Sequence, residues 1–141
     1  MREFKIETST EKEREFVLNS LLAYNRRFVT ETNGIPEERI NKVIKDDDGT
    51  ILAGINCESF WDITHISILW VDKDHRKQGF GSQLLQYVED VSRHYGIHQM
   101  TLDTFDFQAK DFYERHGFVV YGMLEDSPKG HTQYFMRKVL D

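Results

Sequence analysis

Two glycines and two basic residues occupy a short stretch between an apolar segment and a helical pattern. Residues 76–81 read Arg-Lys-Gln-Gly-Phe-Gly, and the helical pattern starts at Ser82. A helix N-terminus leaves backbone N–H groups without intrahelical partners and carries the positive end of the helix dipole, so it stabilises an anion. Glycines let the backbone approach a bulky pyrophosphate, and Arg76 and Lys77 add positive charge. The spacing predicts a phosphate-binding loop.

Two better-known phosphate loops are excluded by the residues that follow. A nucleotide P-loop ends in Gly-Lys-Ser/Thr, whereas Gly81 is followed by Ser-Gln. The dinucleotide fingerprint needs a third glycine at the position occupied by Leu84. The pattern that remains is Arg-x-x-Gly-x-Gly.

This loop, together with a later segment, resembles the acetyl-CoA signature of the GNAT superfamily of N-acetyltransferases. The loop follows Leu-Trp-Val at residues 69–71, and residues 107–118, Phe-Gln-Ala-Lys-Asp-Phe-Tyr-Glu-Arg-His-Gly-Phe, are similar to the family's later helix. The likeness extends from about residue 42 to 138. It implies a mixed α/β fold with a mostly antiparallel, splayed central sheet flanked by helices. It also implies acetyl transfer from acetyl-CoA to a primary amine of a small molecule or peptide, without a metal.

The resemblance also assigns roles to single residues. Tyr113 matches the family tyrosine beside the CoA sulfur, and a phenol is protonated at neutral pH, so it can act as the general acid for the departing thiolate. The backbone of Leu69 and Val71 matches the strand edge that binds the pantetheine arm. The complete set of cofactor-binding residues is Leu69, Val71, Arg76, Lys77, Gln78, Gly79, Phe80, Gly81, Ser82 and Gln108.

The group that accepts the amine proton stays open. The candidates are Asp62, His65, Asp103, His131 and water; the family often uses a glutamate, and residues 63–71 contain none. A second departure lies three residues before Ala109, where many members carry Asn and this chain has Asp106. Residues 103–109 and 130–135 resemble one bacterial subgroup of poorly defined substrate, in which Phe107 and Gln108 fill that role.

The overall composition is typical of a compact enzyme of one domain, residues 1–141, with 39% hydrophobic residues. The net charge of −6 argues against nucleic acid as a partner and favours cationic acceptors. Cys57 is the single cysteine and is predicted to be a buried thiol, and no stretch has the length of a membrane span, so a cytoplasmic location is expected. A homodimer stays open, as does a binding module that holds acetyl-CoA or a partner without turnover.

Hydrophobic periodicity predicts alternating elements along the chain. A strand at 4–8 precedes a helix with a capping box at Thr10–Glu13, which ends near Phe28. This helix is expected to turn Phe16, Val17, Leu21, Leu22 and Tyr24 inward. A helical turn at 37–40, a hairpin of 42–45 with 50–60, and a central strand at 63–71, apolar on both faces, come next. A helix to Gly96, a strand at 100–105, a helix at 108–116 and strands at 118–124 and 132–139 complete the order. The acceptor pocket is expected from residues 24–38 and 127–134.

Overall fold

A computed structural model of the chain describes residues 2–30 and 34–140. Its residues fall into two compact units, Met1–Thr32 and Asn33–Asp141, and each is described by itself. The prediction that residues 1–141 form a single domain remains a prediction.

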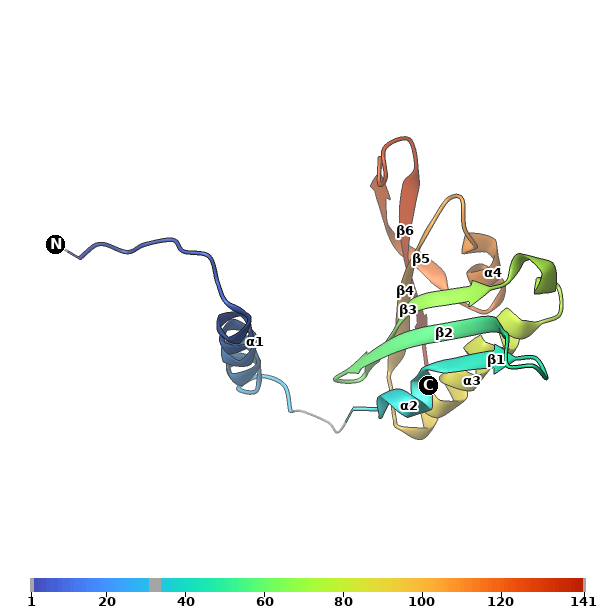
Figure 1. Cartoon of the computed structure of the whole chain (residues 1–141), viewed down its shortest axis with the longest axis horizontal. Coiled ribbons are helices and arrows are strands. Elements are labelled where there is room, and N and C mark those ends of the chain that lie inside the picture. The colour runs from blue at the N-terminus through green and yellow to red at the C-terminus, as the bar shows by residue number, and fades with distance from the viewer. Residues whose placement is uncertain (1, 31–33, 141) are drawn as a thin grey trace. The chain divides into compact units, whose positions relative to one another are not determined.

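The first unit consists of an extended segment followed by the helix α1 (Glu11–Asn25) (Figure 1). The predicted capping box is confirmed. The backbone N–H of Glu13 donates to Thr10 Oγ1 at 3.2 Å, and the Thr10 N–H donates to Glu13 Oε1 at 2.9 Å. These two bonds satisfy donors that a helix start leaves without partners. The helix ends three residues before Phe28, and a turn follows in which Phe28 N–H donates to the Asn25 carbonyl.

Two predictions for the first unit are wrong. Residues 4–8 form no strand, and Phe4 and Ile6 are exposed. A strand needs a neighbour for its backbone N–H and C=O groups, and no described residue pairs with this segment. The predicted inward-facing side chains of α1 are also not buried, since no residue of the helix is. The five side chains that were predicted to face inward are those of Phe16, Val17, Leu21, Leu22 and Tyr24.

The second unit is built on a six-stranded sheet of order β1-β2-β3-β4-β6-β5. After the short helix α2 (Glu37–Ile40) come β1 (Lys42–Lys45), β2 (Ile51–Phe60) and β3 (Ile63–Val71). They are followed by β4 (Gln99–Phe105), β5 (Val119–Glu125) and β6 (Thr132–Val139). Four of the five strand pairs are antiparallel, which confirms the predicted sheet type and the hairpin of β1 with β2.

The parallel pair, β3 with β4, separates part-way along its length. Their register runs from Ile63 opposite Gln99 to Ile66 opposite Leu102 and stops there. Beyond that point β3 continues to Val71 and β4 to Phe105 without pairing to each other, and the two strands diverge in Figure 1. This separation is the splay that the sequence predicted. It leaves one edge of β3 from Ser67 onward without a strand partner.

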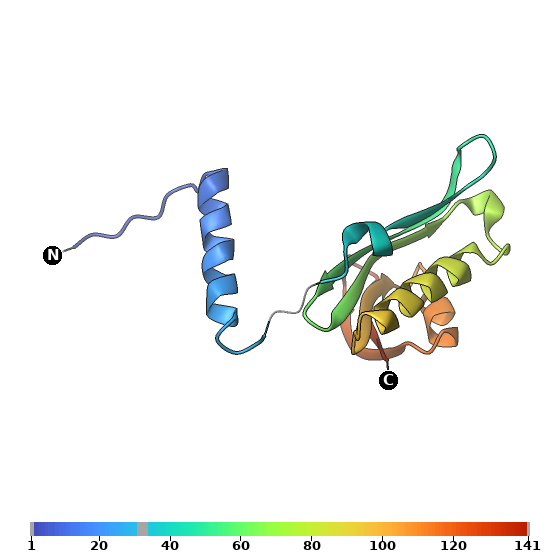
Figure 2. The same ribbon diagram turned by 90° about the horizontal axis from the view of Figure 1, so that it is seen from below.

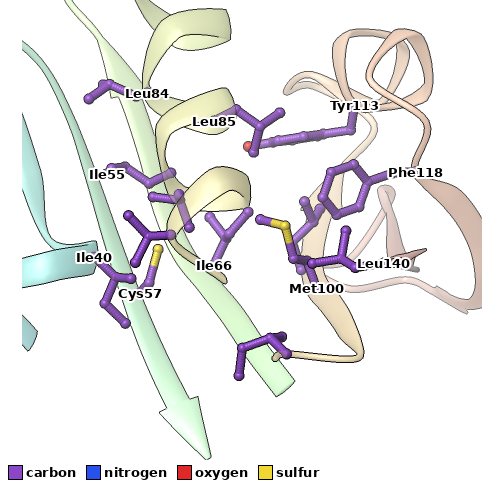
Figure 3. Packing of buried hydrophobic residues seen from close by; sticks show 14 of the residues in the cluster. Ile40, Ile55, Cys57, Ile66, Leu84, Leu85, Met100, Tyr113, Phe118 and Leu140 are labelled. Atoms are coloured by element: carbon purple, nitrogen blue, oxygen red, sulfur yellow. The ribbon is translucent and has the colours of Figure 1, made fainter. Parts of the chain in front are cut away.

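Helix α3 (Phe80–His94) lies along one face of this sheet, and α4 (Lys110–Arg115) follows β4 (Figure 2). Helix α3 begins two residues before the predicted Ser82, and Gly96 follows its end at φ +74°. Leu84, Leu85 and Val88 turn toward the sheet because they recur at helical spacing. Figure 3 shows this core, in which side chains of α3 face those of the strands and of the Tyr113–Phe118 segment.

The opposite face of the sheet, here called the open face, is only partly buried within this unit. The prediction that β3 is apolar and buried on both faces is wrong, because Ile68 and Trp70 are 55% and 46% exposed. The prediction for Cys57 is confirmed, since it lies in the core beneath α3. The sheet therefore has two chemically different sides: an apolar side under α3, and a side that carries polar and aromatic groups in contact with solvent.

Candidate acetyl-transfer site

A cavity of about 810 Å³ opens where β3 and β4 separate. The diverging ends of the two strands form its walls, and the loop before α3 and the helix α4 close it. Most of the predicted site residues line it together: Leu69, Val71, Arg76, Lys77, Gly79, Phe80, Gly81, Ser82, Gln108 and Tyr113. Gln78 is the exception and does not line this cavity. Segments separated by more than 40 residues in the sequence thus meet around one space.

The loop between β3 and α3 presents backbone N–H groups to this cavity. Gly79 is the N-cap residue of α3 and adopts φ +81°, a left-handed conformation that costs glycine little. No side chain caps the helix start, and its first turn carries no acidic residue. The N–H groups of this turn therefore lack intrahelical acceptors and form the positive end of a 15-residue helix. This is the arrangement that binds phosphate.

Gly81 serves close packing rather than an unusual backbone angle. A Cβ built at this position would lie 3.3 Å from Cζ of Phe112 and 3.7 Å from Cγ2 of Val71. The absence of a side chain lets the first turn of α3 lie against α4 and the end of β3. The two glycines of the motif thus have separate physical roles.

Asp72 fixes the shape of the loop from its base. Its carboxylate accepts hydrogen bonds from the His75 ring at 2.8 Å and from the Asp74 N–H at 3.1 Å, and its own N–H donates to the Leu52 carbonyl. The hydrogen bond from His75, followed by the one from Asp74, lowers the pKa of Asp72 below its ordinary value. The carboxylate therefore stays charged and holds the turn in place at neutral pH.

Sequence reasoning missed a contact between the two motifs. Ser82 Oγ, in the first turn of α3, lies 3.0 Å from Nε2 of His116, which follows α4. Burial, and then the positive charges of Lys138 and Arg115, lower the pKa of His116. This favours the neutral ring, whose Nε2 can accept a hydrogen bond from the Ser82 hydroxyl. No local pattern signals this pair, because its members are 34 residues apart.

The phenol of Tyr113 reaches the cavity from the apolar side. The ring lies beside Leu85 in Figure 3, with its centroid 5.9 Å from that of Phe118, and the residue is only 7% exposed. Burial raises the pKa of Tyr113 to about 12, with a smaller contribution from Cys57. Among the described residues no fully buried side-chain polar atom lacks a hydrogen-bond partner, and none of them pairs with this hydroxyl. Tyr113 thus lines the cavity as a buried residue, and its raised pKa favours the protonated phenol.

Gln108 and Asp106 take different positions at the start of α4. Gln108 lines the cavity, and its Oε1 accepts hydrogen bonds from Thr104 Oγ1 and from the Phe105 N–H, both at 3.1 Å. Asp106 instead accepts from the Thr132 N–H at 2.9 Å and pairs with His131 at 2.8 Å. The hydrogen bond from the Thr132 N–H, followed by the hydrogen bond from His131, lowers the pKa of Asp106 below its ordinary value. Its carboxylate joins the segment after β4 to the start of β6.

The four side chains considered as proton acceptors lie in different places. Asp103, on β4, lines the cavity. His65 lies next to it on the open face, with Nε2 4.0 Å from Asp103 Oδ1. His131 is paired with Asp106, and Asp62 lies in the turn between β2 and β3, where its carbonyl accepts the His98 N–H. Of the four, Asp103 is therefore the one that lines the cavity, and His65 is the one that lies beside it.

The predicted acceptor pocket is distributed over both units. Tyr24 and Phe28 belong to the first unit, whereas α2 and residues 127–134 belong to the second. Glu31, part of the same prediction, lies outside the described residues.

These features suit a cofactor-dependent group-transfer site, and comparisons with known proteins place the chain among acetyltransferases. The model of the Acetyltransferase (GNAT) family matches residues 8–118. Blasticidin-S acetyltransferase of Streptomyces morookaense is 33% identical over 93 residues, which cover 65% of this chain and 68% of that protein. A crystal structure of an acetyltransferase from Bacillus cereus is 39% identical, with a TM-score of 0.88 over 97% of this chain and 98% of that one.

A structure of aminoglycoside 6'-N-acetyltransferase complexed with coenzyme A shares the fold at 17% identity, with a TM-score of 0.61 over 69% of this chain and 70% of that one. The chain therefore belongs to the GNAT family. It is an acetyl-CoA-dependent N-acetyltransferase.

No helix within residues 2–30 and 34–140 is both long and apolar enough to cross a membrane. The same residues contain no group of three or more His, Cys, Asp or Glu side chains placed to hold a metal ion.

Proposed function

We propose that this chain transfers the acetyl group of acetyl-CoA to a primary amine of a small molecule or peptide, with Tyr113 as the general acid. The observation that carries the proposal is that Tyr113, whose raised pKa favours the protonated phenol, lines the same cavity as the loop before α3. One space thus holds a proton donor and a site for the cofactor's phosphates.

Two supports orient the cofactor. Its pyrophosphate binds the N–H groups at the start of α3, with Arg76 and Lys77 adding charge. Its pantetheine arm carries amides, which pair with the backbone of Leu69 and Val71 along the edge that β4 leaves free. Gln108 lines the same cavity and contributes to holding the arm. The thioester then lies near the point where β3 and β4 separate, within reach of Tyr113.

The reaction is a direct displacement through a tetrahedral intermediate. The neutral amine nitrogen attacks the thioester carbonyl carbon, so a C–N bond forms and the carbonyl oxygen becomes an oxyanion. The C–S bond breaks when the carbonyl re-forms. The sulfur leaves as a thiolate and takes the proton of the Tyr113 hydroxyl, which an amine-derived proton later replaces. A buried phenol suits this step because its neutral form is favoured until a base develops beside it.

The test is release of the CoA thiol from acetyl-CoA with a panel of amines. The panel contains blasticidin S, suggested by the relative that acetylates it, a polyamine, an aminoglycoside and a peptide with a free N-terminus. We expect thiol release with at least one member, and an increase in melting temperature with CoA alone.

Stabilisation by CoA without thiol release across the panel would instead identify a non-catalytic acetyl-CoA-binding module. The cytoplasmic location and a homodimer remain predictions.

A further inference from the structure

A line of polar side chains crosses three strands on the open face of the sheet and ends at the cavity. His65 Nδ1 on β3 lies 2.7 Å from Thr101 Oγ1 on β4. Asp103, two residues further along β4, accepts a hydrogen bond at 2.8 Å from Nε2 of Gln133 on β6. Ser127 Oγ donates to Gln133 Oε1 at 2.8 Å and extends the line into the loop before β6.

We propose that Asp103 and His65 form the site that binds the ammonium group of the acceptor and removes its proton. This inference rests on the proposed transfer to a primary amine and names the residues that make the amine reactive. An alkylammonium ion has no lone pair, so it must lose a proton before it can attack the thioester. The reaction therefore needs an anion to hold the cation and a base to take the proton.

The distance between the two side chains suits this task. His65 Nε2 and Asp103 Oδ1 are 4.0 Å apart, which is too long for a direct hydrogen bond. A nitrogen located between them is within hydrogen-bond reach of both atoms, and a primary ammonium group has three N–H donors to share. One N–H can donate to Asp103 Oδ1 and a second to His65 Nε2, while the carbon substituent points away.

The neighbours of each group prepare it for its role. Thr101 Oγ1 can accept the Nδ1–H of His65, which leaves the lone pair of Nε2 free toward Asp103. Gln133 Nε2 donates a hydrogen bond to Asp103 Oδ2, so Oδ1 is the oxygen that remains available to accept from a ligand. Both side chains are partly exposed, at 30% for His65 and 35% for Asp103, so a solute can reach them.

The location of Asp103 joins this pair to the chemistry. Asp103 follows Leu102, the last residue of β4 that pairs with β3, and it lines the cavity that Tyr113 also lines. An amine held by Asp103 Oδ1 thus lies at the rim of the space proposed for the thioester. The proton donor for sulfur approaches from the α3 side and the proton acceptor for nitrogen from the open face.

Other charged groups on this face favour a cation. Glu58 on β2 is opposite His65 in the strand register, so directly opposed side chains place a second carboxylate beside the ring. Arg137 on β6 is opposite Thr101, one strand farther from His65. An ammonium ion at the pair therefore meets two carboxylates, and Arg137 lies on the far side of Thr101 from His65.

The ammonium group loses two protons in becoming an amide: His65 takes the first, and the second replaces the proton that Tyr113 gives to sulfur. The ammonium N–H bond breaks as the proton moves to His65 Nε2, and the freed electron pair attacks the carbonyl carbon. The imidazolium that forms is stabilised by the charge of Asp103 and releases its proton to water on the open face. Asp103 stays a carboxylate throughout and orients the amine.

Kinetics with the amine accepted in the panel separate these roles. We expect Asp103→Asn to raise the KM of the amine at least about tenfold, because a charge-assisted contact is lost. We expect His65→Asn to lower kcat by about 10²-fold with a smaller change in KM, as for loss of a general base. The matched control is Glu125→Gln, which removes one exposed negative charge from the edge strand β5, outside the pair and outside the cavity, and should change both constants less than threefold.

A second measurement needs no turnover. Histidine ¹⁵N resonances are recorded while methylammonium chloride, or tetramethylammonium chloride as a cation without N–H donors, is added to the full chain. We expect methylammonium to shift the His65 signals and Asp103→Asn to abolish the shift, with tetramethylammonium ineffective in both proteins.

Equal shifts with the two cations, or a methylammonium shift that survives Asp103→Asn, would overturn the inference. So would a wild-type KM and kcat in both variants. Failure of acetyl transfer itself would appear as absent thiol release in the wild-type protein, which the cation titration does not depend on, so the two proposals fail separately.

Discussion

The two sides of the sheet use different parts of the polypeptide for their chemistry. On the α3 side, the proposed phosphate loop relies on backbone N–H groups and on the left-handed Gly79, and the proposed proton donor is a buried tyrosine. On the open face, the His65–Asp103 pair relies on exposed side chains held by cross-strand hydrogen bonds. Substitutions on the α3 side should therefore change cofactor binding and stability, and those on the open face should change acceptor kinetics.

The largest expected effect is at Gly79. Valine at φ +81° is strained, and the shape of the loop that aims N–H groups at phosphate would change. Loss of two charge-assisted hydrogen bonds weakens CoA binding by about 10²-fold or more. Calorimetry with CoA measures this loss.

Gly49→Val is the matched control, because Gly49 has φ +89° in the turn between β1 and β2 and equally open surroundings. Both variants should lose similar stability, but only the Gly79 variant should lose cofactor affinity. Gly81→Val tests the other glycine, since its new side chain meets Phe112. Unchanged CoA affinity in a folded Gly79→Val or Gly81→Val protein would contradict the proposed phosphate site.

The next largest effect is on turnover at Tyr113. Tyr113→Phe removes the proton donor and keeps the ring in the core, so kcat should fall by about 10²-fold while the affinity for CoA stays close to that of the wild type. Tyr121→Phe, at an exposed tyrosine of β5, controls for loss of a phenol. Turnover in the Tyr113 variant equal to that of the control would leave Tyr113 with a packing role alone.

Alkaline stability gives a second measure of the α3 side. Burial raises the pKa of both Cys57 and Tyr113 to about 12. In the unfolded chain both groups ionise at lower pH, so the folded state binds more protons and stability falls as the pH rises from about 9 toward 12. Each group contributes a slope of about 1.4 kcal/mol per pH unit within its own interval.

Urea unfolding across this pH range measures the slope. Tyr113→Phe and Cys57→Ala should each make the decline shallower, whereas Tyr121→Phe should not. An unchanged slope in both core variants would mean that these groups titrate alike in the folded and unfolded chain, which is inconsistent with their burial.

The residues that line the cavity beside α3 could be predicted from sequence because their determinants are local. Residues 76–81 contain the turn, the glycines and the charges within one strand-loop-helix unit, and Tyr113 lies inside a contiguous motif. The strands that begin at residue 42 and later could also be predicted, because each is an apolar run bounded by turn residues. Such signals depend on neighbours along the chain, which the sequence contains in full.

The open face could be predicted only in part because strand register assembles it. His65, Asp103 and His131 were equal candidates in the sequence, and only the pairing of β3 with β4 brings the first two together. The Ser82–His116 contact was missed for the same reason. The errors in the first unit have a related origin: apolar periodicity in residues 4–28 indicates a surface suited to burial but does not identify its partner.

A moderate effect is expected when the hydrogen bonds that connect Ser127 and Gln133 to Asp103 are removed. Gln133→Leu frees Asp103 Oδ2 and removes a hydrogen bond worth about 1 kcal/mol, so the KM of the amine should rise about fivefold with CoA affinity unchanged. Ser127→Ala loosens Gln133 without touching Asp103 and should have a smaller effect. A larger rise in the KM of the amine for Ser127→Ala than for Gln133→Leu would contradict the proposal that Ser127 acts on Asp103 through Gln133.

The smallest effect concerns long-range charge. A net charge of −6, with Glu37 and Glu38 exposed on α2, should attract cationic amines, and ions screen this attraction beyond about 8 Å at physiological salt. The kcat/KM of a polycationic amine should therefore fall a few-fold between low and high salt, while that of a monoamine changes less. The Glu37→Gln, Glu38→Gln double variant removes two of these charges, so it should reduce the difference in salt dependence between the two amines. The short-range contact with Asp103 should remain, because neither residue belongs to the His65–Asp103 pair. If the polycation and the monoamine respond alike, attraction acts only at the short range of Asp103, and the acidic surface contributes to solubility alone.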